Sequence, residues 1–135
     1  MEMSRHHEPA PEWVAADIAE FGRGLGLSGL ALSLRGTAAV AFENGLGLAL
    51  EWHGGSLCLY LTCPADAEPG LLRRLLTVAH PRGRWGGRLR AGYAERQGRA
   101  ALLAVLAQQE ISVPRLNAAF EELWQAMQSL MAPRG

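Results

Sequence analysis

The 135-residue chain contains no lysine, two cysteines and few aromatic residues. No apolar run approaches the roughly 18 residues of a membrane-spanning helix, so no span is predicted. The N-terminus lacks the apolar core of a secretory signal peptide, and we therefore expect a cytoplasmic protein. The length predicts one domain, with a core large enough to need neither disulfide nor metal.

The two cysteines, Cys58 and Cys63, lie in one predicted strand. Strand side chains alternate between faces, so a separation of five residues places the two thiols on opposite sides of the sheet. They cannot form a disulfide within that strand, and with the few histidines they match no zinc spacing. We therefore expect two small apolar side chains in a reducing compartment, with no metal and no cofactor.

Acidic and basic residues are unevenly distributed, although the net charge is zero. Residues 1–68 carry nine acids and three arginines, whereas residues 69–109 carry eight arginines and one acid. Arginines interleaved with Trp85 and Tyr93 are typical of sites that bind single-stranded nucleic acid. A nucleic-acid-binding module that uses the Arg73–Arg99 cluster is therefore one hypothesis, although the overall charge is not basic.

Residues suited to catalysis are sparse. No serine or cysteine stands in a nucleophile elbow, and no glycine-rich segment has the context of a nucleotide-binding loop. Glu51 and His53 share one predicted strand face, while His80 suits the C-terminus of a helix. A small enzyme or ligand carrier that uses one of these histidines is a further hypothesis. The sequence favours a protein that is not an enzyme.

A polar tail, residues 1–10, precedes a predicted helix that begins near Pro11 and ends at Gly24 and Gly26. Apolar residues recur in it at helical spacing. They are Val14, Ile18, Phe21 and Leu25.

Turn residues then predict a three-stranded meander over 37–42, 46–53 and 56–62. Asn44-Gly45 and Gly54-Gly55 are pairs that favour two-residue type I′ turns. The resulting register gives the pairs Ala39–Leu50, Ala41–Leu48, Trp52–Leu57, Leu50–Leu59 and Leu48–Leu61 on one face. The other face is also largely apolar, which predicts a second cover by the fold, a dimer mate or a client segment. It would carry Val40, Phe42, Gly47, Ala49, Glu51, His53, Cys58 and Tyr60.

The second half predicts a short helix at 68–79 with Asp66 as its cap, strands at 88–94 and 99–107, and a final helix capped by Ser112. The short helix has an apolar band wide enough for self-association. The long helix carries the core-facing stripe Leu116, Phe120, Leu123, Met127 and Leu130, which Trp124 and Met131 widen. The expected fold class is α+β in the order α-β-β-β-α-β-β-α, a twisted antiparallel sheet with three helices.

Four features together resemble one known family. They are the segment Glu20-Phe-Gly-Arg-Gly-Leu-Gly-Leu-Ser-Gly-Leu-Ala-Leu, the three-stranded meander, the leucine-rich short helix, and the strand-to-helix ending from Gly98. Over about residues 12–131 the chain is similar to the Tir-chaperone (CesT-like) family, the class I chaperones of bacterial type III secretion. The domain would span 11–131, followed by a tail at 132–135.

The resemblance implies a cytoplasmic chaperone that catalyses nothing. It would bind the N-terminal segment of a secreted effector or apparatus component and keep that segment non-globular and secretion-competent. A homodimer is expected, and a heterodimer with another small chaperone is a variant. A regulatory, partner-binding protein of the secretion system is a second variant.

The resemblance also implies two sites. Members dimerise through the second helix and the fourth strand, which here contribute Leu72, Leu75, Leu76, Leu89 and Ala91. Clients lay apolar side chains into grooves made by the first helix and the sheet. The matching positions are Trp13, Ile18, Phe21, Val40, Phe42 and Tyr60. A client strand would add main-chain hydrogen bonds at a sheet edge, while pockets receive alternate side chains.

Overall fold

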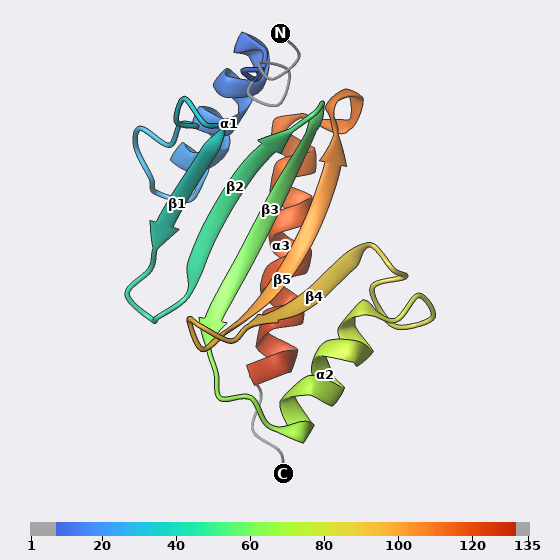
Figure 1. The fold of residues 1–135 in the computed structure, drawn as a ribbon. Coiled ribbons are helices and arrows are strands. Elements are labelled where there is room, and N and C mark those ends of the chain that lie inside the picture. The colour runs from blue at the N-terminus through green and yellow to red at the C-terminus, as the bar shows by residue number, and fades with distance from the viewer. Residues whose placement is uncertain (1–7, 132–135) are drawn as a thin grey trace, which may run out of the picture.

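A twisted five-stranded antiparallel sheet and three helices form the fold of residues 8–131, the part that the computed structural model describes (Figure 1). The predicted order α-β-β-β-α-β-β-α is confirmed, with a short 3₁₀ helix before the last helix. The predicted tails fall outside the described residues, except for 8–10. The elements are α1 Glu12–Gly24, β1 Thr37–Ala41, β2 Gly47–His53, β3 Ser56–Pro64, α2 Pro69–Ala79, β4 Leu89–Ala94, β5 Arg99–Ala107, η2 Gln108–Glu110 and α3 Val113–Met131.

The strand order β1-β2-β3-β5-β4 makes β1 and β4 the two edges of the sheet. Helix α3 lies along β3 and β5 on the rear side in Figure 1, with α1 toward β1 and α2 against β4. Every second residue of β2, β3 and β5 is buried. The core therefore lies between this covered face and the three helices.

The register of the β2–β3 hairpin is the predicted one. Trp52 pairs with Leu57, Leu50 with Leu59 and Leu48 with Leu61, around the two-residue turn Gly54-Gly55. Both glycines have positive φ angles, which is the conformation that a type I′ turn requires.

The long helix α3 completes the core. Its N-terminus is capped as predicted, because the Ser112 Oγ accepts a hydrogen bond from the Arg115 N–H at 3.2 Å. Fully burying one leucine contributes about 1.5–3 kcal/mol, so the stripe of α3 is a large part of the driving force. Its buried members are Leu116, Ala119, Leu123, Ala126, Met127 and Leu130. The predicted Asp66 cap of α2 is wrong, since α2 begins at Pro69 with Glu68 as N-cap residue and no side-chain capping bond.

The first hairpin differs from the prediction by one residue. Its loop has three residues, 43–45, because the Phe42 N–H donates to the Leu46 carbonyl at 2.8 Å. The observed pairs are Ala38–Leu50 and Val40–Leu48 rather than Ala39–Leu50 and Ala41–Leu48. A slip of one residue exchanges the two faces of a strand. Val40 and Phe42 therefore pack against the core, and not on the opposite face as predicted.

The second face of the sheet has no helix over it within residues 8–131 (Figure 1). We call it the open face. It carries the predicted residues of β2 and β3, and the register adds small and apolar residues from β5. Its members include Gly47, Ala49, Glu51, His53, Cys58, Tyr60, Ala101, Leu103 and Val105.

Candidate functional site

An apolar groove lies between the β1–β2 loop and α3. Phe42 and the 43–44 segment form one wall, and Phe120, Glu121 and Trp124 form the other, around a hollow of about 570 Å³. A smaller hollow continues it past Asn44 and Trp124. We call the two together the loop–α3 groove. Its lining residues are Phe42, Glu43, Asn44, Leu46, Phe120, Glu121, Trp124, Met127, Gln128 and Met131.

The loop wall of the groove is held by local hydrogen bonds. The Gly45 N–H donates to the Phe42 carbonyl at 3.1 Å, and the Leu46 N–H donates to Asn44 Oδ1 at 3.1 Å. Gly45 has a φ of +90°, a left-handed conformation that glycine adopts without strain. This is the three-residue hairpin loop in which a turn is followed by a left-handed residue.

The helical wall of the groove is aromatic. The rings of Phe120 and Trp124 stack with centroids 6.2 Å apart, and Phe120 meets Phe21 of α1 edge to face at 6.0 Å. Phe21 is fully buried, whereas Phe120 and Trp124 are half-buried. The groove thus presents two aromatic side chains that are supported from beneath by α1.

The outer edge of β1 adjoins this groove. The Gly36 carbonyl accepts a hydrogen bond from the Trp52 N–H of β2, and the Phe42 N–H donates to Leu46, the residue before β2. The alternation of antiparallel pairing then turns the backbone groups of Ala39 and Ala41 away from β2. No strand pairs with that edge among the described residues. A second hollow of about 420 Å³, which includes Val40, lies between β1 and the 26–31 segment.

The structure brings together only part of the predicted client site. Phe42 lies in the groove, Val40 lines the neighbouring hollow, and Trp13 is 44% exposed on α1. Ile18 and Phe21 are fully buried and fasten α1 to the core, so they present no surface.

Tyr60 lies on the open face, on the opposite side of the sheet from the core side chains of β3. Phe120 and Trp124, which do line the groove, were predicted only as core-facing helix residues. Their exposure depends on where the β1–β2 loop lies, and no signal in the helix pattern reveals it.

The predicted dimer residues also divide into exposed and buried ones. Leu72 and Leu76 are 45% and 72% exposed, one turn apart on α2. Leu75 and Leu89 are buried in the core, and Ala91 is half-buried on the covered face. An interface at this place would therefore use the outer side of α2.

A polar cluster occupies the open face. Glu51 Oε1 lies 3.0 Å from His53 Nε2 and accepts a hydrogen bond from the Tyr60 hydroxyl at 2.9 Å. The contact with His53 lowers the pKa of the Glu51 carboxyl. Burial, and then the bond to Glu51, raise the pKa of Tyr60 to about 12. Glu51 Oε1 is thus the contact that His53 and Tyr60 share.

The two cysteines lie on opposite faces, as predicted, and both are free thiols. Burial raises the pKa of each, so neither is an activated nucleophile. His80 is the C-terminal cap residue of α2, where its Nδ1 accepts a hydrogen bond from the Arg82 N–H at 3.0 Å. Residues 8–131 hold no group of three potential metal ligands.

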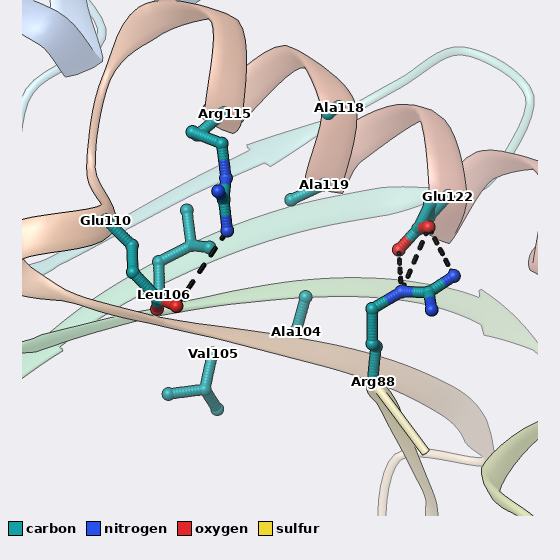
Figure 2. A pocket seen from close by; sticks show the side chains of 9 residues that line it. All are labelled: Arg88, Ala104, Val105, Leu106, Glu110, Arg115, Ala118, Ala119 and Glu122. Atoms are coloured by element: carbon teal, nitrogen blue, oxygen red, sulfur yellow. Dashed lines mark hydrogen bonds and ion pairs between the residues drawn. The ribbon is translucent and has the colours of Figure 1, made fainter. Parts of the chain in front are cut away.

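Figure 2 shows a further hollow of about 350 Å³ between β5 and the first half of α3. Arg88 forks onto the Glu122 carboxylate at one end, with a closest contact of 2.7 Å, and Arg115 lies 3.8 Å from Glu110 at the other. Ala104, Ala118 and Ala119 lie between these ion pairs, so the floor is apolar while the rim carries both charges.

Three arginines of the Arg73–Arg99 cluster are engaged in contacts within the fold. Arg88 is paired with Glu122, Arg74 Nε donates to the Leu130 carbonyl, and Arg99 bonds to Thr62 and Gly45. The predicted stacking residues are also occupied. Trp85 is buried, and the Tyr93 hydroxyl donates to the Ala65 carbonyl. The hypothesis of a base-stacking platform therefore loses its support.

Comparison with known proteins decides the family. The family model of the type III secretory system chaperone SycN matches residues 13–131. This chain belongs to that family of type III secretion chaperones. It is a cytoplasmic bacterial chaperone of type III secretion and not an enzyme, which is the role that the resemblance implied. No helix among the described residues has the length and hydropathy to cross a membrane.

Solved structures share the chaperone's fold. A chain in the ExsC–ExsE complex is 22% identical, with a TM-score of 0.74 over 93% of this chain and 98% of that one. A chain in the HopA1–SchA chaperone–effector complex is 18% identical, with a TM-score of 0.70 over 93% and 100%. A chain in the ExoU–SpcU complex from Pseudomonas aeruginosa is 21% identical, with a TM-score of 0.63 over 84% and 93%. No curated protein sequence matches the chain.

Proposed function

We propose that the chaperone holds an extended N-terminal segment of its client along the outer edge of β1, with apolar side chains in the loop–α3 groove. The observation that carries this proposal is an aromatic groove at the end of an unpaired edge strand. An added strand would form main-chain hydrogen bonds with Ala39 and Ala41. Its side chains on the covered side would reach the hollow at Val40 and the groove at Phe42.

The rim of the groove defines the chemistry of the segment. Glu43 and Glu121 are exposed there, and neither forms an ion pair within residues 8–131. The floor is apolar. The segment therefore carries bulky apolar residues beside a basic residue.

Binding in this form explains chaperone action in physical terms. A segment that is paired with β1 cannot at the same time fold into its own domain, so it stays extended. Its apolar side chains are covered and do not aggregate. Support comes from similar folds solved as complexes, among them ExsC with ExsE and the Yersinia pestis chaperone SycH with a fragment of YscM2.

The test begins with the tagged chaperone purified from its own bacterium under secretion-inducing conditions. Mass spectrometry identifies the copurifying protein, and its N-terminal segment is made as a fluorescent peptide. Trp124→Ala together with Phe42→Asp should weaken peptide binding at least about tenfold, because both residues line the groove. Val105→Ala, an exposed apolar residue on the open face, is the matched control. A folded double variant that binds at full affinity would place the client elsewhere.

A homodimer through α2 belongs to the same proposal. Leu72 and Leu76 are large, exposed and adjacent on one side of the helix, which is unusual for a surface that stays in water. The open edge of the sheet at β4 lies next to α2. A second copy of the chain, or another small chaperone, would cover both leucines.

A further inference from the structure

Arg99 reaches from β5 across the open face to the β1–β2 loop. It is the first residue of β5 and pairs with Pro64 of β3. Its Nε donates to the Thr62 Oγ1 at 3.1 Å, and its Nη2 donates to the Gly45 carbonyl at 2.8 Å. Figure 1 shows why this is possible, because the β1–β2 loop and the β4–β5 turn lie at the same end of the sheet, near the tip of β3.

A glycine lies beneath this side chain, at position 47. A Cβ at Gly47 would lie 3.0 Å from Thr62 Oγ1, so that hydroxyl, to which Arg99 bonds, would have to shift by a few tenths of an ångström. The same Cβ would lie 3.4 Å from Arg99 Nη2, which is the limit of ordinary contact. Gly47 has no positive φ that would otherwise explain a glycine. The space above Gly47 is thus occupied by the Thr62 hydroxyl and the Arg99 guanidinium.

Arg99 is the link between the loop and the rest of the sheet. The other hydrogen bonds of the 43–45 segment stay within residues 42–46. Among the described residues, Arg99 is the one side chain from outside the hairpin that hydrogen bonds to this loop. The bond is charge-assisted, and such bonds are about twice as strong as neutral ones.

From these contacts we infer that Arg99 is a positioning residue for the loop–α3 groove. It does not touch the groove, but it fixes the loop that supplies Glu43 and Asn44 to one wall, while α3 supplies the other wall independently. The width of the groove is therefore set by a residue on the opposite side of the sheet. The inference rests on the proposed function only for its effect on client binding.

Hydrogen exchange of the free chaperone tests the positioning itself and needs no client. In Arg99→Ala, the amides of Gly45 and Leu46 should exchange about tenfold faster or more, the factor expected for one lost bond to a charged group. In Arg99→Lys, the exchange rates of these amides should lie between those of the wild-type protein and those of Arg99→Ala, because an ammonium cannot bond both acceptors in the fork geometry. Gly47→Ala should reproduce the loop effect while Arg99 is kept.

Arg96→Ala is the matched control, since Arg96 is exposed in the neighbouring turn and makes no ion pair within residues 8–131. The Gly54-Gly55 hairpin at the opposite end should keep its exchange rates in every variant. Equal acceleration of both hairpins would show a general loss of stability and would overturn the inference. So would unchanged exchange at Gly45 and Leu46.

The fluorescent client peptide provides the second readout. Arg99→Ala should weaken its binding about fivefold or more, and the loss should shrink when Trp124→Ala has already removed the opposite wall. Additive effects of the two substitutions would contradict action through the groove. If no peptide binds the wild-type protein at this groove, the proposed function fails, whereas the exchange result still decides the role of Arg99.

Discussion

The indole of Trp124 stacks on the ring of Phe120 one turn before it on α3, and both face the loop that follows β1. Neither ring is fully buried, although each belongs to the apolar stripe of the helix. A helix that packs its stripe against the sheet would normally cover such residues. Here a hollow separates the β1–β2 loop from α3, and the two rings are left as the helical wall of the loop–α3 groove.

Phe21 should matter for folding and not for client contact. Its side chain is fully buried and meets Phe120 edge to face. Phe21→Ala should lower the free energy of unfolding by about 3–5 kcal/mol, the cost of removing a buried aromatic. Trp13→Ala, at an exposed position on the same helix, should change it by less than about 1 kcal/mol. Urea unfolding measures both, and equal costs would contradict the observed burial.

Charge reversal at the groove rim should weaken client binding. Glu43→Arg with Glu121→Arg replaces two exposed carboxylates by cations, which repel the basic residue proposed for the client. The affinity of the peptide should fall about three- to tenfold at low salt and less at high salt, because exposed charges are screened. Glu12→Arg on α1 is the control. A client that binds more tightly after the reversal would refute a basic segment.

Leu76→Asp should separate a dimer. The leucine is 72% exposed on α2, so the substitution costs the monomer little but places a charge in the proposed interface. Sedimentation should show the mass of two chains for the wild-type protein and of one for the variant. Leu34→Asp, at an almost fully exposed leucine before β1, should keep the wild-type mass. A Leu76→Asp variant that still sediments with the mass of two chains would exclude the outer side of α2 as the interface.

Tyr60 should titrate well above the usual range for a phenol. Its pKa is raised from 10.0 to about 12, so the folded state holds the proton more tightly than the unfolded state does. The contribution of the protonated Tyr60 to the free energy of unfolding is therefore complete below pH 10 and is lost as the pH rises toward 12. Phenolate absorbance, with Tyr60→Phe as reference, measures the value.

Glu51→Gln tests the cause of that shift. Removing the carboxylate takes away the acceptor charge that disfavours the phenolate, so the pKa of Tyr60 should fall toward its ordinary value. Burial is the larger cause and persists in the variant, so part of the shift should remain. An absorbance step already near the ordinary pKa in the wild-type protein would contradict both causes.

Local chemistry made much of the fold predictable. The Gly54-Gly55 turn and the alternation of leucines determine the β2–β3 register together, since both depend on residues close in sequence. The cap at Ser112 and the stripe of α3 are equally local. The β1 register was missed because Asn44-Gly45 also fits a three-residue loop, and the choice between the two loops changes which face Val40 occupies.

The sequence by itself determined the order of elements, the central hairpin and the chaperone family. Only the tertiary structure decided which apolar residues face solvent. Leu72 and Leu75 look alike in a helical pattern, yet one is exposed and the other is in the core. Phe21 and Trp124 also look alike in their helical patterns, yet Phe21 is buried and Trp124 is half-buried. The hydrogen bond between Arg99 and Gly45, 54 residues apart, likewise forms only in the tertiary structure. Exposure depends on which distant element covers a residue, and that arrangement follows from packing of the whole chain.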